Sequence, residues 1–280
     1  MHDSAAQTKD APIGVFDSGI GGLSVLRHIR TQLPHENLLY FADSGFAPYG
    51  DKTEQQIIER SFAIAAFLRQ HHIKALAIPC NTATAAAIRL LREEYPALPI
   101  VGVEPGLKPA ASLTKTGTVG VLATAGTLSS TKFQTLREQV SATTGVRVVS
   151  QACVGLADQV EKGELNSLAT AAMLRRYVSP LIEQGADTLV LGCTHYPFVQ
   201  ELISEIAESV SKQAVQLVDT GEAVARQLAR LLEQHHLLRQ SIEVGTVAAF
   251  TSGSENALTH AFERLLHIQP KVTRVTAQAS

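Results

Sequence analysis

The chain has 280 residues, of which 45% are hydrophobic and 18% charged, and its formal net charge is −2. This composition is typical of a globular protein with about two domains, and it excludes a basic surface for nucleic acid or anionic lipid. No apolar run approaches the ~20 residues of a membrane span, and the first twelve residues lack signal-peptide features. Three cysteines, an odd number, indicate free thiols and therefore a cytoplasmic location.

Short apolar runs alternate along the chain with longer helical patterns. The predicted strands are 13–16, 37–42, 74–78, 100–103, 118–123, 146–150, 187–192 and 215–218. The predicted helices are 23–32, 53–70, 82–94, 129–139, 167–184, 198–209 and 222–234. Each strand is almost continuously apolar, as strands covered on both faces are. This alternation predicts a parallel α/β architecture.

Local signals mark some of the element ends. Thr53 and Gln56 have the spacing of a capping box, and Gly185 is a stop signal for the helix before it. Pro180 is expected to interrupt or kink that helix. The first dozen and roughly the last ten residues are polar enough to be mobile tails.

Two segments of the chain share one layout. Residues 74–90 and 188–202 each contain a buried strand, a cysteine, two small polar or histidine positions, and then a helix. This repeat predicts two similar α/β lobes, each a mainly parallel sheet flanked by helices and each presenting one cysteine. In such folds ligands bind at the carboxyl ends of the strands.

Small polar side chains gather at the predicted strand ends. The positions are Asp17-Ser18-Gly19, Asp43-Ser44-Gly45, Cys80-Asn81-Thr82, Glu104, Thr124, Cys193-Thr194-His195 and Asp219-Thr220-Gly221. No Arg or Lys is among them. Such a site suits a small zwitterion or anion held by backbone N–H groups and neutral donors. Asp219 is more simply explained as a turn or capping residue.

The three cysteines differ in their surroundings. Cys153 has only Gln151 as a polar neighbour in the sequence and is interpreted as a buried hydrophobic residue. Cys80 and Cys193 fall at strand-to-helix junctions, where helix N–H groups favour a thiolate. Cys193 and His195 could supply two metal ligands, but no third accompanies them, so we expect no metal.

Two chemistries fit this pattern. Cys193 with His195 as base would make a thiol hydrolase. Two thiols on separate lobes would instead suit the inversion of a stereocentre, which needs one proton acceptor and one donor on opposite faces of a carbon. Each thiol should then have a neighbour that assists it, Asp17 or Asp43 in one lobe and His195 or Glu161 in the other.

The motifs GVFDSGIGGLSV, YFADSGFAPYGDK, IPCNTATA and LGCTHYPFV, in this order, resemble those of the glutamate racemases from about residue 13 to 266. The resemblance implies interconversion of L- and D-glutamate, which supplies D-glutamate for peptidoglycan, without metal or other cofactor. It also implies a homodimer, and an active site between the two lobes. The first lobe would comprise residues 1–103 and 215–280 and carry Cys80, and the second would comprise 104–214 and carry Cys193.

The same resemblance assigns roles to residues. It implies that Cys80 removes the proton from D-glutamate and Cys193 from L-glutamate. Asp17 and His195 would assist the thiols, with Asp43 and Glu161 as secondary candidates. The substrate-binding residues that it implies are Asp17, Ser18, Tyr49, Gly50, Asn81, Thr82, Thr124, Thr127, Thr194 and His195.

Two other functions compete with this one. Aspartate racemases share the two-cysteine plan, but their second motif usually carries Glu where this chain has His195, and the Pro48-Tyr49-Gly50 segment also favours glutamate. A binding or regulatory protein is the alternative from another class, because some glutamate racemases bind DNA gyrase. The net charge gives that role no independent support.

Overall fold

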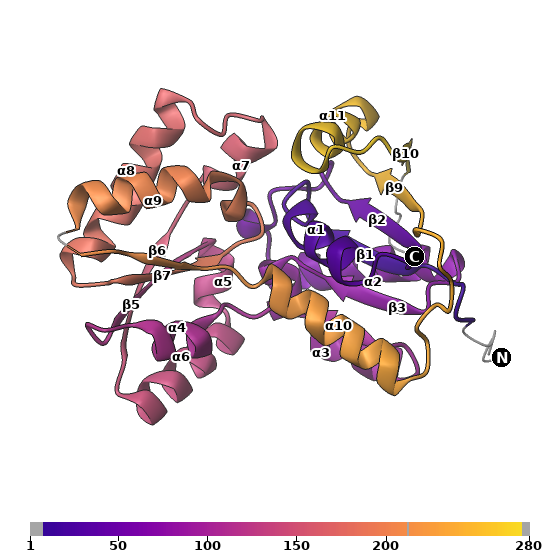
Figure 1. The fold of residues 1–280 in the computed structure, drawn as a ribbon, viewed down its shortest axis with the longest axis horizontal. Helices are drawn as coiled ribbons and strands as arrows, with labels where there is room; N and C mark the ends of the chain where they lie inside the picture. The colour runs from indigo at the N-terminus through magenta and orange to yellow at the C-terminus, as the bar shows by residue number, and fades with distance from the viewer. Residues whose placement is uncertain (1–7, 212, 276–280) are drawn as a thin grey trace. The chain divides into compact units, whose positions relative to one another are not determined.

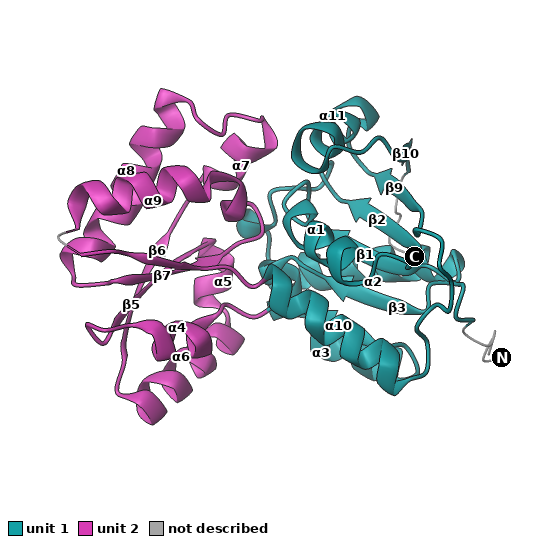
Figure 2. Cartoon of the chain, viewed as in Figure 1, with its two compact units in different colours: residues 1–103, 221–280 teal, residues 104–220 magenta. Residues whose placement is uncertain are grey.

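The computed structural model describes residues 8–211 and 213–275 (Figure 1). The chain forms two compact units, unit 1 (Met1–Val103 and Gly221–Ser280) and unit 2 (Glu104–Thr220), coloured separately in Figure 2. Each unit is a parallel sheet flanked by helices, which confirms the predicted α/β fold class. No described helix has the length and apolar character needed to cross a membrane.

Unit 1 is built on a sheet whose described strands follow the order β10-β9-β2-β1-β3-β4. Its strands are β1 (Ile13–Asp17), β2 (Leu38–Ala42), β3 (Ala75–Ile78), β4 (Ile100–Gly102), β9 (Val247–Thr251) and β10 (Lys271–Arg274). All neighbours pair in parallel, with Phe16 opposite Phe41 and Val15 opposite Ala77. β1, β2 and β3 therefore end together at one edge of the sheet.

Helices cover this sheet. They are α1 (Leu23–Gln32), α2 (Glu54–Gln70), α3 (Asn81–Glu94), α10 (Gly221–Gln234) and α11 (Glu255–Leu266), with the short 3-10 turn η1 (Tyr49–Asp51). α2 packs against α3, and α1 packs against α10. The predicted capping box of α2 is confirmed: Thr53 Oγ1 accepts from the Gln56 N–H, and the Gln56 side chain accepts from the Thr53 N–H.

Unit 2 has the described strand order β6-β5-β7-β8, again all parallel. The strands are β5 (Thr118–Ala123), β6 (Arg147–Ala152), β7 (Thr188–Gly192) and β8 (Gln216–Val218). The helices are α4 (Leu107–Leu113), α5 (Ala125–Ser129), α6 (Thr131–Thr144), α7 (Leu156–Glu161), α8 (Leu168–Glu183) and α9 (Gln200–Val210), with the 3-10 turn η2 (Tyr196–Val199). Figure 1 shows α8 and α9 on one face of the sheet and α4 and α6 on the other.

Several expectations about element ends need correction. The helix expected at 129–139 is two helices, because Ser130 is extended and caps α6 by accepting from the Phe133 N–H. Pro180 does not interrupt α8, which continues to Glu183, whereas Gly185 with φ +94° ends it as predicted. The chain returns to unit 1 at Gly221 rather than at 215, because β8 pairs with β7 in the second sheet.

The strands at the sheet edges also differ from expectation. β6 was expected to be covered on both faces, but its side chains are half-buried or exposed because it has a neighbour on one side only. The last ten residues were expected to be a mobile tail, yet residues 271–274 form β10, which pairs with β9. Residues 1–7 and 276–280 of the expected tails lie outside the described residues.

A buried ion pair joins distant segments at the other end of the unit 1 sheet. The Lys74 ammonium contacts the Glu36 carboxylate, and both side chains are almost fully buried. Lys74 also donates to the carbonyl of Lys9 at 2.5 Å, and Glu36 Oε1 accepts from the Arg239 N–H at 2.8 Å. Burial lowers the pKa of Lys74, while the Glu36 carboxylate opposes that effect.

Lys74→Met is expected to lower the free energy of unfolding by about 3–5 kcal/mol, because it leaves the Glu36 carboxylate buried without its cation. Urea unfolding measures this. The double variant Lys74→Met/Glu36→Gln should recover much of the loss, since it removes the unpaired charge. Arg89→Ala, which breaks an exposed pair with Glu93, is the control and should cost less than about 0.5 kcal/mol. A Lys74→Met loss as small as that of the control would contradict the interpretation.

Candidate active site

Three neighbouring strands of unit 1 end in polar side chains. Asp17 is the last residue of β1, Asp43 follows β2, and Cys80 lies two residues beyond β3. β1 lies between the other two strands, and the Asp43 N–H donates to the Asp17 carbonyl at 2.9 Å. The structure thus brings together three of the residues predicted from the sequence.

Cys80 is the N-cap of α3. Its Sγ accepts from the Ala83 N–H at 3.4 Å and donates to Ser18 Oγ at 3.8 Å, and the residue is only 5% exposed. Sulfur thus takes the place of the oxygen that normally caps a helix, in a position where the helix N-terminus favours a negative charge. A thiolate at Cys80 would have the Ala83 N–H donor already in place.

Asp17 reaches this thiol through Ser18. The Ser18 hydroxyl lies 3.5 Å from Asp17 Oδ1, which also accepts from the Gly19 N–H at 3.1 Å. Asp17 is fully buried. The described contacts therefore form a chain in which the Cys80 thiol donates to the Ser18 hydroxyl and that hydroxyl donates to the Asp17 carboxylate, so Asp17 holds the Ser18 oxygen as an acceptor facing Cys80.

Asp43 and Tyr49, both predicted site residues, bond to each other. The Tyr49 hydroxyl donates to Asp43 Oδ2 at 2.7 Å, and the Arg60 guanidinium pairs with the same carboxylate. Burial, followed by the charge of Asp43, raises the pKa of Tyr49 well above its ordinary value. The phenol therefore stays protonated, and its proton is donated to Asp43. A ligand could bond this segment through the backbone of the Tyr49–Gly50 turn.

Asn81 and Thr82 form the first turn of α3, beside Cys80, and both are buried. Asn81 Oδ1 has no hydrogen-bond partner among the described residues. A buried acceptor left unpaired costs free energy unless a ligand or water supplies a donor. Asn81 is thus suited to accept a hydrogen bond from a bound ligand.

In unit 2, Cys193 follows β7 directly and is paired with a histidine. Cys193 Sγ lies 3.6 Å from His195 Nδ1, and His195 Nε2 lies 2.7 Å from Glu161 Oε1. Burial opposes a charge on His195, but the hydrogen bonds with Cys193 and Glu161 outweigh it and raise the pKa of the imidazole well above its ordinary value. An imidazolium here donates one N–H to the sulfur and the other to the carboxylate.

The surroundings of Cys193 differ from those expected. The sequence predicts a strand-to-helix junction at Cys193, with the helix over 198–209; in the structure η2 comes between the strand and α9, which begins at Gln200. Cys193 therefore does not cap an α-helix as Cys80 does. Its described partner is His195, so the two thiols have different means of stabilising a negative charge.

The remaining predicted residues of unit 2 lie at neighbouring strand ends. Thr124 follows β5, next to β7; its hydroxyl caps α5 by accepting from the Thr127 N–H and bonds Thr127 Oγ1 at 3.0 Å. Thr194 is buried between Cys193 and His195. The structure brings these residues to the same edge of the second sheet as Cys193.

Cys153 is buried as predicted, and burial strongly raises the pKa of its thiol. The expectation that Gln151 is its one polar neighbour is wrong, because the Tyr196 phenol lies beside it. Tyr196 is fully buried in η2. Its contact with Cys153 brings together residues 43 positions apart, which no local pattern could indicate.

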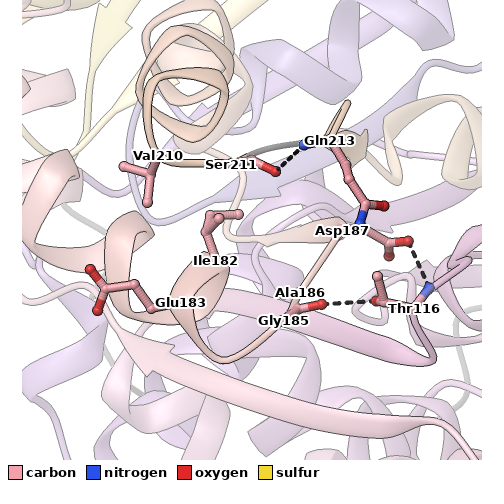
Figure 3. Close-up of a pocket in the computed structure, with 9 residues that line it drawn as sticks. All are labelled: Thr116, Ile182, Glu183, Gly185, Ala186, Asp187, Val210, Ser211 and Gln213. Carbon is pink, nitrogen blue, oxygen red and sulfur yellow. Dashed lines mark hydrogen bonds between the residues drawn. The ribbon is translucent and has the colours of Figure 1, made fainter.

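Two other features lie outside these clusters. The described residues contain no group of three or more His, Cys, Asp or Glu side chains that could hold a metal ion. A cavity of about 210 Å³ in unit 2, lined by Thr116, Gly185 and Asp187 among others, is drawn in Figure 3. Asp187 precedes β7 and Cys193 follows it, so the length of this strand, roughly 17 Å, separates the cavity from the thiol.

Each of the two parallel α/β units thus carries a buried free thiol just beyond the end of a sheet strand, Cys80 in unit 1 and Cys193 in unit 2. The sequence profile of the Asp/Glu/Hydantoin racemase family matches residues 13–228. The chain belongs to this family.

Known proteins similar to this chain include a relative and two solved structures. The glutamate racemase of Stutzerimonas stutzeri is 54% identical over 81% of this chain and 84% of its own length. The structure of Francisella tularensis glutamate racemase in complex with D-glutamate has a TM-score of 0.84 at 28% identity, covering 97% of this chain and 100% of that one. Escherichia coli glutamate racemase in complex with L-glutamate and the activator UDP-MurNAc-Ala has a TM-score of 0.81 at 31% identity, covering 94% and 97%.

Glu161→Gln is expected to lower the pKa of His195, because it removes the negative charge that stabilises the imidazolium. The folded-state pKa of His195 exceeds its unfolded value, so the stability that the pair contributes is present at low pH and lost as pH rises through the folded pKa. The variant should therefore lose stability mainly below that pKa.

Nuclear magnetic resonance titration of the His195 ring checks the pKa, and thermal unfolding at several pH values checks the stability. Glu164→Gln removes an exposed carboxylate three residues away and is the matched control. An unchanged His195 pKa in Glu161→Gln would contradict the role of the pair.

Proposed function

We propose that the protein is a glutamate racemase that interconverts L- and D-glutamate with two cysteine thiols as acid and base. The observation that carries the proposal is that Cys80 in unit 1 and Cys193 in unit 2 are both free and buried. Each lies beyond the end of a sheet strand, and each has its own polar partners. Both relatives of known structure described above hold an enantiomer of glutamate, D in one and L in the other.

The reaction moves one proton across a carbon. The Cys80 thiolate takes the α-proton of D-glutamate, and the electron pair of the broken C–H bond delocalises toward the α-carboxylate. The Cys193 thiol then delivers its proton to the opposite face, which forms the C–H bond of L-glutamate. The reverse reaction begins with the Cys193 thiolate. This mechanism requires one thiol on each face of the same α-carbon.

Each thiol has residues that can assist it. The Ala83 N–H can stabilise a thiolate at Cys80, and the Ser18 hydroxyl, held by Asp17, can accept a hydrogen bond from the protonated thiol. His195, held by Glu161, can stabilise a thiolate at Cys193 and donate the proton that resets it. We assign these supporting roles to Asp17 and His195, with Glu161 acting through the histidine.

The polar groups near the thiols suit a zwitterionic substrate. The unpaired Asn81 Oδ1 can accept from an ammonium group. Hydroxyl groups and backbone N–H groups can donate to carboxylates without introducing a fixed positive charge. The residues that we propose to contact glutamate are Asp17, Ser18, Tyr49, Gly50, Asn81, Thr82, Thr124, Thr127, Thr194 and His195.

Glutamate is favoured over aspartate as the substrate. The relatives at about half identity are glutamate racemases, and His195 stands where aspartate racemases usually carry Glu. D-Glutamate made by this reaction would supply peptidoglycan synthesis in the cytoplasm. Homodimer formation stays a prediction, as does the absence of nucleic-acid and membrane binding.

Circular dichroism of L-glutamate incubated with the purified protein is expected to decay to zero without added cofactor. In deuterated water the product should carry deuterium at the α-carbon. Because enantiomers have equal free energies in water, the equilibrium constant is one, and kcat/KM must be the same for both. L-Aspartate is the control substrate and should retain its signal. Loss of the aspartate signal instead would favour aspartate racemase.

Replacing either thiol is expected to affect the reactions of the two enantiomers differently. Racemisation needs both, so Cys80→Ser and Cys193→Ser should each lower its rate by about 10²–10⁴-fold. A glutamate analogue that expels a β-substituent after proton removal needs only one base. Cys80→Ser should therefore retain elimination from the L-analogue and lose it from the D-analogue, and Cys193→Ser should do the reverse.

Cys153→Ser is the control for these variants, because it changes a buried thiol outside the proposed mechanism. It should lower the elimination rates of both enantiomers alike, and only through stability. Equal losses on both enantiomers in Cys80→Ser and Cys193→Ser would reject the two-base assignment and favour Cys193 as a nucleophile with His195 as its base.

A further inference from the structure

The Asp43 carboxylate is fully buried, and four described hydrogen bonds surround it. Oδ1 accepts from Arg60 Nη2 at 2.5 Å and from Ser252 Oγ at 2.6 Å. Oδ2 accepts from Arg60 Nε and from the Tyr49 hydroxyl, each at 2.7 Å. A carboxylate has about four lone-pair directions, so those of Asp43 are occupied. Asp43 is thus an anchor for other groups rather than a base for Cys80.

The residues that bond Asp43 also hold the segment between β2 and α2. Besides bonding Asp43, Ser252 Oγ accepts from the Gly45 N–H at 3.0 Å. The Arg60 guanidinium lies 5.3 Å from the centre of the Phe46 ring, which packs edge-on against Tyr49. A side chain at Gly45 would place its Cβ 2.5 Å from the Ser252 carbonyl oxygen, so only glycine allows this approach. Arg60 and Ser252 therefore hold the first part of the segment directly, and the Tyr49 hydroxyl through Asp43.

The segment between β2 and α2 lies beside the part of unit 1 that carries Cys80. The turn η1 packs against α3, the helix that Cys80 caps, and Tyr49 belongs to the same buried cluster as Cys80. Ser252 lies 209 residues from Asp43 in the chain, just beyond β9, whose last residue Thr251 pairs with Ala42 at the end of β2. The C-terminal part of unit 1 thereby contacts the segment beside Cys80.

We infer that Arg60 and Ser252 are positioning residues that, through Asp43, hold the Tyr49–Gly50 turn in place beside Cys80. The inference deepens the proposed function, because it rests on this turn being part of the glutamate site. Neither residue is among those that the sequence predicted for the site, and the strand that Ser252 follows, β9, was not predicted either. Arg60 lies within α2, and Ser252 reaches the site through the pairing of β9 with β2.

Ser252→Ala tests the inference while leaving Asp43 paired with Arg60. The loosened turn should raise KM for both enantiomers about fivefold, the cost of one hydrogen bond, with kcat changed less than about twofold because the thiols are untouched. Iodoacetamide should also alkylate Cys80 several-fold faster, since the turn that buries it opens more often, while the rate at Cys193 stays the same. Peptide mass spectrometry measures the two rates separately.

Ser254→Ala is the matched control. Ser254 lies in the same segment and caps α11 by accepting from the Ala257 N–H, so its loss lowers thermal stability without any contact to Asp43. It should change neither KM nor the alkylation ratio of Cys80 to Cys193. Ser252→Thr, which keeps the hydroxyl, should restore both readouts toward the wild-type values.

Arg60→Lys provides a second variant, because it keeps a cation at Asp43 but loses the two-pronged contact. It should move KM and the alkylation ratio in the same direction as Ser252→Ala. If both variants lower the melting temperature while KM and the alkylation ratio stay at wild-type values, the residues are merely structural and the inference is wrong. If the wild type does not racemise glutamate but the alkylation ratio moves as expected, the proposed function fails and the positioning role stands.

Discussion

The pairing of parallel strands is the constraint on which the proposed chemistry depends. β1 bonds β2 on one side and β3 on the other, so the polar residues after these strands emerge at one edge. The second sheet repeats this with β5 between β6 and β7. Gly192 makes the approach of β7 to β5 possible, because a Cβ there would lie 2.9 Å from the Leu122 carbonyl oxygen. A slip of one residue in either sheet would turn every side chain of the strand to the opposite face.

The two thiols that we propose as acid and base have different surroundings. Cys80 has neutral partners, a helix N–H group that donates to it and a hydroxyl that accepts from it, and neither changes its charge with pH. Cys193 has a titratable partner, His195, whose charge depends on Glu161. Because the forward and reverse reactions pass through the same transition states, a reaction with an equilibrium constant of one has the same kcat/KM in both directions. The surroundings of the two thiols can therefore differ without favouring one direction.

Two buried ion pairs bond segments of unit 1 that are far apart in the chain. At the amino ends of the strands, Lys74 of the Lys74–Glu36 pair donates to the carbonyl of Lys9, and Glu36 accepts from the backbone N–H of Arg239. At the carboxyl ends of the strands, Asp43 of the Arg60–Asp43 pair accepts a hydrogen bond from the Ser252 hydroxyl. Breaking such a pair is costly because it leaves a charge in a low-dielectric interior. The residues after Gly221 thus complete the unit that begins the chain, and they support the segment beside Cys80.

The sequence by itself determined the alternation of strands and helices, the parallel sheets and both cysteines with their strand-end neighbours, because apolar runs and local capping signals are short-range properties. It did not predict β9 and β10, and it predicted β6 but not that its side chains are only half-buried or exposed, since burial depends on which elements lie beside a strand. Tertiary structure alone decided that Asp43 pairs with Arg60 and Ser252, that Glu161 holds His195, and that η2 separates Cys193 from α9. Those contacts join residues far apart in the chain, and their free energy exists only once folding has excluded water from between them.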